Sequence, residues 1–443
     1  MSTTKHHVGF ATRWGFILAA VGSAVGMANV WGFPYRMATY GGGAFLLIYI
    51  FFVVVFGSLA LPAEFAIGRR ARTGTLGAYE LAWASRKPSL RPVGKAIGWL
   101  PLAGSLCIAI GYAVIVAYVL KALFDSLFGT LLTVDTQMWF ESFAMTPTSV
   151  VPFHVTIVLV TLLTLFLGAK SIERTNRILM PVFFIIFAIF AIRVAFLPGV
   201  LDGYLFMFTP RWEALVNPET WIFAMGQAFF SLSVTGSGMI VYGAYLSKDE
   251  DVVAVARRTA LFDTIAATVA ALTIIPAVFA YGLDISSGPG LLFVTLPAIL
   301  QDIPFGQLFA IILYVAMIAA GVSSLQNMFE VVGESLLYRF KFLKRWIVLV
   351  LIAVVVLGVG LNMEAIFQWG PWMDWVSIYI IPLGATIGAI SWFFVMKKED
   401  LLEEINLAAV KKHGDLWYNC GRYLYVPFAL LLCIIALAMQ VAF

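Results

Sequence analysis

The sequence Gly22-Ser23-Ala24-Val25-Gly26 lies in the middle of an apolar segment that is long enough to cross a bilayer. A second stretch of this kind, Thr235-Gly236-Ser237-Gly238, interrupts another apolar segment in the second half of the chain. A helix in hydrocarbon normally bonds all its backbone N–H and C=O groups internally, so a break at mid-depth is tolerated only where protein, ions or a ligand take up the freed groups. The two stretches therefore predict a binding site between two broken helices.

The composition is that of an integral membrane protein. Of the 443 residues, 62% are hydrophobic and 12% are charged, whereas an ordinary soluble domain carries about 25% charged residues. We predict an all-α polytopic membrane protein, a single transmembrane domain over residues 1–443 with about eleven spans of about 20 residues. The spans are expected near 13–37, 42–68, 97–124, 151–169, 176–197, 218–245, 256–283, 305–336, 346–362, 375–396 and 423–443.

The positions of Lys and Arg predict the orientation, because cytoplasmic loops carry an excess of both residues. With a cytoplasmic N-terminus, 24 of the 28 Lys and Arg residues fall on the inner side of the cell membrane. An odd number of spans then places the C-terminus outside. The net charge of +4 reflects this bias and does not indicate a nucleic-acid partner. Residues 1–13 lack the pattern of a cleavable signal peptide, so the first apolar segment is expected to remain as a helix.

The two interrupted segments are the first and the sixth span, the spacing expected for two repeats of inverted topology. Helices 1–5 would form the first repeat in residues 1–200, and helices 6–10 the second repeat in 218–397. Residues 398–443 would carry a surface helix and helix 11. The charged, amphipathic segment 397–415 is interpreted as that inner surface helix. The outer loop 284–304 is expected to hold short helices that act as a lid.

Three separated motifs then indicate a family. They are Asn29-Val30-Trp31-Gly32-Phe33-Pro34-Tyr35, Gly41-Gly42-Gly43-Ala44-Phe45 and Gly226-Gln227-Ala228-Phe229-Phe230-Ser231-Leu232-Ser233. In this order they resemble the signatures of the neurotransmitter:sodium symporters, and most closely those of bacterial eleven-helix transporters of hydrophobic amino acids. The resemblance implies sodium-coupled import by alternating access on a 5+5 inverted-repeat fold, with helices 1 and 6 unwound at mid-membrane.

Two sodium ions are the expected cofactors. Sodium is a hard cation that prefers oxygen ligands, and unwound backbone supplies free carbonyl groups. By the resemblance, the first site would use Ala24, Asn29, Ser231 and Asp263, together with the substrate carboxylate. The second site would use Gly22, Val25, Ala320, Ser323 and Ser324. Taken alone, a pair such as Ser323-Ser324 in a membrane helix is more often an interhelical hydrogen bond or a packing feature, and its position in helix 8 opposite the first break is what favours a sodium ligand.

Asp263 departs from the family pattern, since relatives usually carry Asn at this position. A carboxylate at mid-membrane costs about 2.5–3.5 kcal/mol on insertion scales. One interpretation is a charge solvated near the inner end of helix 7, where Arg257 and Arg258 lie one to two turns away. The other is a fixed negative charge at the first sodium site. Animal relatives need chloride to balance the sodium charge, so the second interpretation predicts transport that is independent of chloride.

The substrate site is expected between the two breaks. Half-helix N-termini offer free N–H groups to an anionic group such as a carboxylate, and Tyr112 matches the family tyrosine that hydrogen-bonds this carboxylate. The absence of a charged side chain in the matching pocket predicts a neutral, apolar amino acid, from Leu and Val to Phe and Trp. Phe229 is expected as an outer lid, and Gly236 and Met328 as the positions that give breadth, unless both serve only the backbone and core. The expected substrate residues are Ala24, Gly26, Ile108, Tyr112, Phe229, Phe230, Ser231, Ser233, Gly236 and Met328.

The gates depart from the family pattern. Asp374 matches the acid of the outer gate, but Gly32 occupies the position of its Arg, and Arg36, one helical turn on, is the candidate for the missing cation. On the inner side His7, Phe10 and Tyr338 stand where relatives have Arg, Trp and Asp, so Lys5 or Glu334 are candidate partners. Glu64 resembles the family's buried Glu in helix 2, which braces the unwound part of helix 6; a proton-carrying role stays open. Pro181 predicts a kink or a local unwinding of helix 5.

Two rival functions stay open at this point. A proton-coupled transporter on the same fold would use Asp263 or Glu64 as the proton carrier, and an amino-acid sensor would bind without transport. An enzyme is not expected, because the sequence carries no phosphate-binding loop and no intramembrane cluster of metal-ligating residues. Among the histidines, His6, His7 and His413 are predicted at inner surfaces, and His154 alone at an outer helix end.

Overall fold

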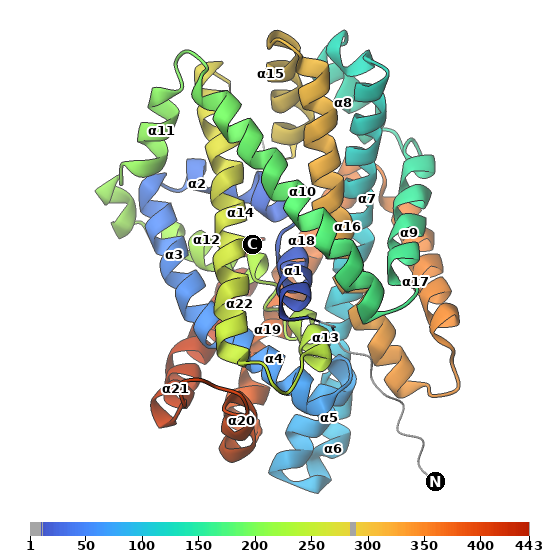
Figure 1. Ribbon diagram of the computed structural model, residues 1–443, viewed down its shortest axis with the longest axis vertical. Coiled ribbons are helices and arrows are strands. Elements are labelled where there is room, and N and C mark those ends of the chain that lie inside the picture. Colours follow the sequence, from blue (N-terminus) through green and yellow to red (C-terminus); the bar gives the residue numbers. More distant parts are fainter. Residues whose placement is uncertain (1–9, 11, 284–288, 443) are drawn as a thin grey trace.

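The computed structural model describes Phe10, residues 12–283 and residues 289–442. This part of the chain is helical throughout, with only an isolated β-bridge between Gly42 and Pro210. The predicted all-α class is confirmed. Figure 1 shows the short helices α8, α11 and α15 at one end of the long axis, and α5, α6, α20 and α21 at the opposite end.

Most of the long helices run between these two ends. The helices are α1 (Arg13–Ala24), α2 (Phe33–Thr39), α3 (Gly43–Ser58), α4 (Ala60–Ala71), α5 (Thr75–Arg86), α6 (Arg91–Ile97), α7 (Trp99–Leu127), α8 (Thr136–Ala144), α9 (Val151–Leu165), α10 (Ala169–Ala195), α11 (Leu201–Phe208), α12 (Pro218–Ser231), α13 (Gly238–Tyr245), α14 (Val252–Ala280), α15 (Leu296–Asp302), α16 (Gly306–Arg339), α17 (Arg345–Gly360), α18 (Ile366–Trp375), α19 (Ile381–Ile390), α20 (Lys398–Ile405), α21 (Asp415–Cys420) and α22 (Val426–Met439).

Eight helices of the described chain are long and apolar enough to cross a membrane, and nine if the bent pair of residues 13–24 and 28–39 forms one span. Two further predicted spans fall short of that length. The fourth, Val151–Leu165, has 15 residues, and the sixth is divided into α12 and α13. The count of eleven spans and the repeat boundaries therefore stay predictions.

Several predicted boundaries are wrong. The tenth span begins at Ile366 and not near 375, because Pro371 lies inside the helix, where it costs one backbone donor without ending the helix. The last helical segment begins at Asp415 rather than at 423. The amphipathic segment 397–415 is helical only over Lys398–Ile405. The helix that contains Pro181 is continuous over Ala169–Ala195, so the inner end of α10 is not unwound in this structure.

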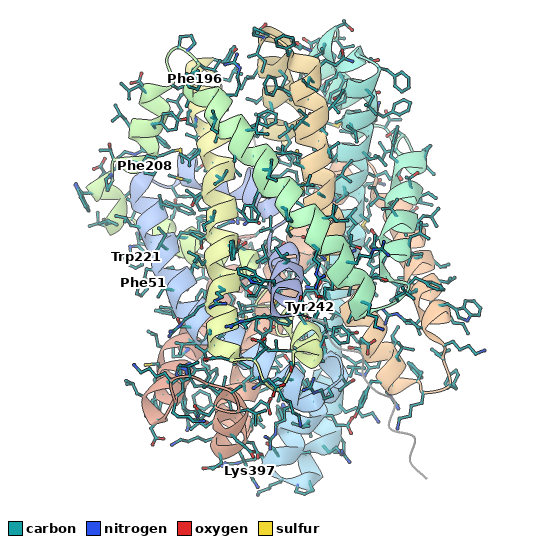
Figure 2. The ribbon with its side chains drawn as sticks, in the orientation of Figure 1. Phe51, Phe196, Phe208, Trp221, Tyr242 and Lys397 are labelled. Carbon is teal, nitrogen blue, oxygen red and sulfur yellow. The ribbon has the colours of Figure 1, made fainter. Side chains whose placement is uncertain are left out.

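The perimeter of the molecule is apolar. Figure 2 shows Phe51, Phe196, Phe208 and Trp221 along one side of it, with Lys397 at one end. Their side chains are 41–79% exposed, and an exposed apolar surface of this extent is typical of contact with lipid chains. Many polar side chains lie in the interior instead. A hydrogen-bond partner lowers the cost of burying each of them, because water is not available there.

A buried pair outside the two breaks illustrates this rule. His154 of α9 and Glu364, in the turn between α17 and α18, are both fully buried, and His154 Nδ1 lies 3.1 Å from Glu364 Oε1. The Tyr118 hydroxyl donates to the backbone carbonyl of Glu364. The expectation that His154 stands alone is therefore wrong: the pair joins the turn that precedes α18 to α9 and α7.

We expect Glu364→Ala to destabilise the protein by about 1–3 kcal/mol, because the His154 ring would lose its partner while staying buried. Thermal unfolding in detergent, followed by helical circular dichroism, measures this loss. Glu403→Ala is the matched control: Glu403 is exposed and pairs with Arg70 at the surface, where a pair contributes about 0–1 kcal/mol. Equal unfolding temperatures for the two variants would contradict a stabilising role of the buried pair.

Candidate ion and substrate site

The first break separates α1 from the helical turn Ala28–Gly32 and bends the segment by 60°. Three side chains meet the backbone groups that it frees. The N–H of Gly26 donates to Asn29 Oδ1 (2.9 Å), and the N–H of Met27 donates to the Tyr112 hydroxyl (2.9 Å). The Ser324 hydroxyl donates to the carbonyl of Val25 (3.2 Å) and, at 3.5 Å, to that of Gly22.

Position 26 needs a residue without a side chain, because two other side chains come close to its Cα atom. A Cβ atom there would lie 2.6 Å from the Tyr112 hydroxyl oxygen and 2.9 Å from Ser324 Oγ. These two residues come from α7 and α16, so the break in helix 1 is held between those two long helices.

The second break covers residues 232–237, between α12 and α13. Ser233 and Gly236 have φ values of 52° and 75°, in the left-handed region. The fully buried Glu64 carboxylate accepts two backbone hydrogen bonds here, from the N–H of Gly236 (2.8 Å) and the N–H of Met239 (3.2 Å). The Ser233 hydroxyl donates to the carbonyl of Ser23 (3.3 Å), so the two breaks touch.

Gly236 does not leave space for a substrate, contrary to expectation. The Tyr79 hydroxyl donates to its carbonyl (3.0 Å), and a Cβ atom at Gly236 would lie 2.8 Å from that hydroxyl and closer still to the carbonyl oxygen of Gly384. The missing side chain is needed for the approach of α19 and Tyr79. Gly236 is thus a backbone position, as the alternative interpretation held.

A cluster of buried oxygen atoms lies beside the first break. Asn29, Ser231 and Asp263 are fully buried, and they come from three separate elements. Asn29 Nδ2 donates to Asp263 Oδ1 (2.8 Å) and to Ser231 Oγ (3.1 Å), and the Ser231 hydroxyl donates to Asp263 Oδ2 (2.7 Å). The Tyr49 hydroxyl, which the sequence analysis missed, reaches Asp263 Oδ2 at 3.5 Å. Ala24 is buried at the end of α1.

The surroundings of Asp263 are neutral. Within the described chain its carboxylate forms no ion pair, and its partners are an amide and two hydroxyl groups. Arg257, one of the two cations considered for it, donates to the Ser58 hydroxyl instead (3.2 Å). The interpretation of Asp263 as a charge solvated at the inner end of its helix does not fit these contacts.

The second group of predicted sodium ligands also lies together. Gly22, Val25, Ala320, Ser323 and Ser324 are all buried, and Ser324 bridges α16 to the two carbonyls of α1. The Ser323 hydroxyl donates to the carbonyl of Ala320 (2.8 Å).

Asn176 of α10 is a further polar residue at this place. A Cβ atom on Gly22 would collide with its Oδ1 atom, which is buried and has no hydrogen-bond partner. Its Nδ2 atom donates to Gln326 Oε1 (2.9 Å). Residues 170–177 form a polar stretch at the start of α10, the fifth predicted span. This stretch was the signal in the sequence from which Asn176 could have been predicted.

A cavity of about 530 Å³ leads to the first break from the side that the charge distribution predicts to be outside, and we call it the outer cavity. Tyr112, Phe230, Arg36 and Asp374 are among the residues that line it. The Phe229 ring, expected as the outer lid, packs instead against Phe56, 4.2 Å between ring centroids, and Tyr425. Phe230 is the ring that faces the outer cavity.

Two other predicted substrate residues do not line the outer cavity itself. Ile108 is buried in α7, and Met328 is half-buried in α16. Neither is among the residues that line the cavity.

The predicted outer gate residues both line the cavity but do not pair. The Arg36 guanidinium donates to Gln227 Oε1, and Asp374 is exposed. Helix α18, which carries Asp374, is fixed to α7 by two indole groups: Trp369 Nε1 donates to the carbonyl of Gly111 (2.8 Å), and Trp372 Nε1 donates to that of Cys107 (3.0 Å).

The end of the molecule that the charge distribution predicts to be cytoplasmic holds an ionic cluster around Arg345. Its guanidinium pairs with Glu330 and, at 2.9 Å, with Glu334, and the Tyr245 hydroxyl of α13 donates to Glu330 Oε1 (2.5 Å). Glu334 was a predicted inner partner, whereas Lys5 and His7 lie outside the described residues. Phe10 packs against the Tyr245 ring, and the Tyr338 hydroxyl donates to Glu80 Oε2 (2.9 Å).

The sequence is similar to those of known transporters. The family model described as "Sodium:neurotransmitter symporter family" matches residues 8–149 and 140–442. A protein of Bacillus subtilis described as "Uncharacterized sodium-dependent transporter YhdH" is 34% identical over 329 residues, 73% of this chain and 71% of its own length. A mouse protein described as "Sodium-dependent neutral amino acid transporter B(0)AT1" is 28% identical over 277 residues, 55% of this chain and 42% of its own length.

A solved structure resembles the whole fold. The crystal structure of MhsT in complex with L-phenylalanine matches with a TM-score of 0.87 and 32% sequence identity, covering 97% of this chain and 99% of MhsT. The predicted family and transporter fold are confirmed, and the chain is a transporter rather than an enzyme. Two broken helices around a buried oxygen cluster, matched over nearly the whole length, lead to one conclusion: the chain belongs to the sodium:neurotransmitter symporter family.

Proposed function

We propose that this protein imports neutral, apolar L-amino acids across the cell membrane together with two sodium ions, and that it does so without chloride. The observation that carries this proposal is the Asp263 carboxylate, which is fully buried, bonded to neutral groups and next to the first helix break. A buried carboxylate of this kind needs a cation or a proton to be stable in a membrane interior.

The first ion would lie between the Ala24 carbonyl, Asn29, Ser231 and Asp263, with the substrate carboxylate as a further ligand. These are oxygen donors, the ligands that a hard cation prefers. Sodium would neutralise the Asp263 charge, and Asp263 would in turn take the place of a bound chloride. In this way the chain would balance the sodium charge with its own side chain.

The second ion would lie between α1 and α16. The donors would be the carbonyls of Gly22, Val25 and Ala320 and the hydroxyls of Ser323 and Ser324. Asn176 Oδ1 supports an ion or water at this place, because it is buried there without a hydrogen-bond partner. A neutral oxygen set of this kind suits a monovalent cation better than a divalent one, whose binding usually includes carboxylates.

The substrate carboxylate would bind at the first break, where the Tyr112 hydroxyl and backbone N–H groups of residues 26 and 27 meet. The apolar side chain would extend toward Ile108, Phe230, Ser233 and Met328. No charged residue is in this set, which favours a neutral substrate. The name of the mouse relative, a neutral amino acid transporter, and the L-phenylalanine bound to MhsT support this substrate class. We propose both aliphatic and aromatic substrates.

Alternating access would close the outer cavity and open the inner end. In the present arrangement the outer cavity reaches Tyr112 and Phe230, while Tyr245, Glu330 and Arg345 hold α13 against α16 and α17. Closure of the outer side would bring Arg36 and Asp374 together over Phe230. Release of the Arg345 cluster would let α13 move on the inner side.

The transport proposal is tested by uptake of labelled leucine and tryptophan into proteoliposomes in chloride-free buffer. We expect an inward sodium gradient to drive accumulation of both amino acids, because substrate and sodium share one site. A potassium gradient of the same size is the control and should give no accumulation.

Two outcomes would contradict the proposal in different ways. Accumulation that follows only a pH gradient would assign Asp263 or Glu64 as a proton carrier. Binding without accumulation would indicate a sensor.

We expect Asp263→Asn to raise the sodium concentration for half-maximal uptake about tenfold in chloride-free buffer. A tenfold change corresponds to about 1.4 kcal/mol, the order expected when an ion loses one charged ligand. The substitution keeps the size of the side chain, removes its charge and replaces one acceptor oxygen with an amide NH2 group. Asp202→Asn, at an exposed position in the first turn of α11, is the matched control. Undiminished uptake by Asp263→Asn without chloride would refute the charge-balancing role.

We expect Tyr245→Phe to accelerate amide hydrogen exchange in α13 about tenfold, since a hydrogen bond to a charged group contributes about 1.5–3 kcal/mol. Mass spectrometry of the peptide that covers residues 238–245 measures this rate. Tyr242→Phe is the matched control on the same helix, because the Tyr242 hydroxyl is buried without a hydrogen-bond partner. Equal rates in the two variants would show that the Arg345 cluster does not hold α13.

A further inference from the structure

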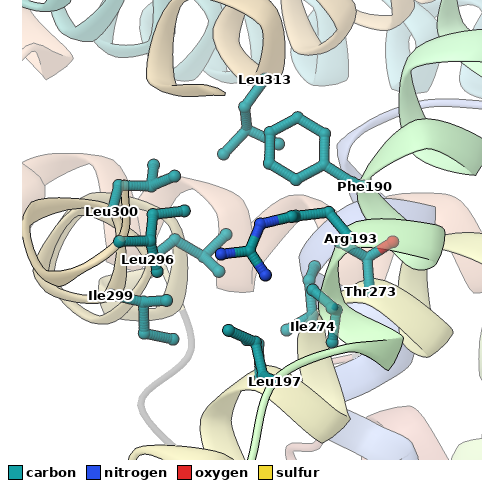
Figure 3. Close-up of a pocket in the computed structure, with 12 residues that line it drawn as sticks. Phe190, Arg193, Leu197, Thr273, Ile274, Leu296, Ile299, Leu300 and Leu313 are labelled. Carbon is teal, nitrogen blue, oxygen red and sulfur yellow. The ribbon is translucent and has the colours of Figure 1, made fainter. Parts of the chain in front are cut away.

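Arg193 stands apart from both breaks and from the ionic clusters. It lies in the last turn of α10, at the end of the helix that the charge distribution predicts to be outside. Its side chain is half-buried, and in the described part of the chain it forms neither an ion pair nor a hydrogen bond. Figure 3 shows the guanidinium group pointing toward Leu296 and Leu300, two of the residues that line a pocket beside it.

The pocket around Arg193 is almost entirely apolar. It has a volume of about 30 Å³ and is lined by residues of α10, α14, α15 and α16. Figure 3 shows Leu296 and Leu300 on one side of the guanidinium and Ile274 on the other. Thr273 offers a hydroxyl group, but that group already donates to the carbonyl of Val269 (3.0 Å).

Within the described residues, which do not include Asp284, no acidic side chain forms an ion pair with Arg193. Asp302 is the last residue of α15, the helix whose Leu296, Ile299 and Leu300 line the pocket. Asp302 is exposed, and the described structure contains no ion pair between it and Arg193. A guanidinium that is partly removed from water with its donors unused costs free energy, which an anion from outside the chain would recover.

The outer surface next to Arg193 indicates where such an anion would come from. The neighbouring Ile189 and Ile192 of α10 are 46% and 62% exposed, and Phe196, directly after this helix, is 79% exposed. On α16, Leu308 is 54% exposed. Exposed apolar side chains of this kind face lipid chains in a membrane protein. An arginine at the end of such a helix lies at the depth of the lipid headgroups, where phosphate is the abundant anion.

We propose that Arg193 and the surrounding pocket bind an anionic phospholipid. The planar guanidinium donates two parallel hydrogen bonds to the lipid phosphate, a geometry that Arg provides and Lys does not. The pocket takes only a small part of the lipid, and the acyl chains lie along the exposed face of α10. Because α15 forms one wall of the pocket through Leu296, Ile299 and Leu300, the bound lipid contacts the outer loop helix directly.

The test is native mass spectrometry of the detergent-purified protein, titrated with phosphatidylglycerol and, separately, with phosphatidylcholine. We expect tighter binding of phosphatidylglycerol to the wild-type protein. Arg193→Gln should weaken that binding about fivefold, the effect of one cation near a membrane surface. Arg193→Lys should give an intermediate loss, since it keeps the charge without the paired donors.

Arg211→Gln is the matched control, because Arg211 is an exposed arginine that stacks on the Phe206 ring and lies outside the pocket. Helical circular dichroism checks that each variant is folded. Unchanged phosphatidylglycerol binding by Arg193→Gln, or an equal loss in the Arg211→Gln control, would overturn the proposal. Displacement of phosphatidylglycerol by inorganic phosphate at equal concentration would also overturn it, because the site would then recognise a free anion and not a lipid. Binding is measured without transport, so this result is independent of the proposed import function.

Discussion

The structure depends on one constraint: backbone groups that are freed by a helix break in an apolar interior must find partners there. At the first break, Asn29, Tyr112 and Ser324 supply them, and at the second break Glu64 and Tyr79 do. These side chains come from five different elements of the fold. The breaks therefore determine which helices must pack around them, and the centre of the molecule is assembled from these contacts.

The buried acids divide into two kinds by their partners. Glu330 has a guanidinium and Glu364 an imidazole, so each has a basic group of the chain beside it. Glu64 and Asp263 have only neutral donors. Both oxygens of Glu64 are committed to backbone N–H groups, which suits a structural brace. The Asp263 oxygens lie among side chains next to the carbonyls of the first break, which suits a group whose charge is completed by a bound cation.

The sequence predicted the features that follow from composition and backbone chemistry. The apolar spans and both breaks followed from hydropathy and from the cost of free backbone groups. The grouping of Asn29, Ser231 and Asp263 and the position of Glu64 followed from the resemblance to the family. Adjacent residues on one helix point in different directions, so the motif alone could not decide between Phe229 and Phe230. The environment of Gly236 depends on the approach of α19, and Tyr49 is one aromatic residue among many. Such contacts between distant segments leave no local signal in the chain.

The attachment of α18 to α7 depends on the backbone of α7 and not on its side chains. Both indole groups bond to backbone carbonyls, those of Cys107 and Gly111, and any amino acid supplies a carbonyl. Gly111 is itself constrained, since a Cβ atom there would collide with Met373. Ile108 lies between Cys107 and Gly111 in α7, and its side chain takes no part in this attachment. The side chain at this position can therefore change while the helix that bears Asp374 stays attached to α7.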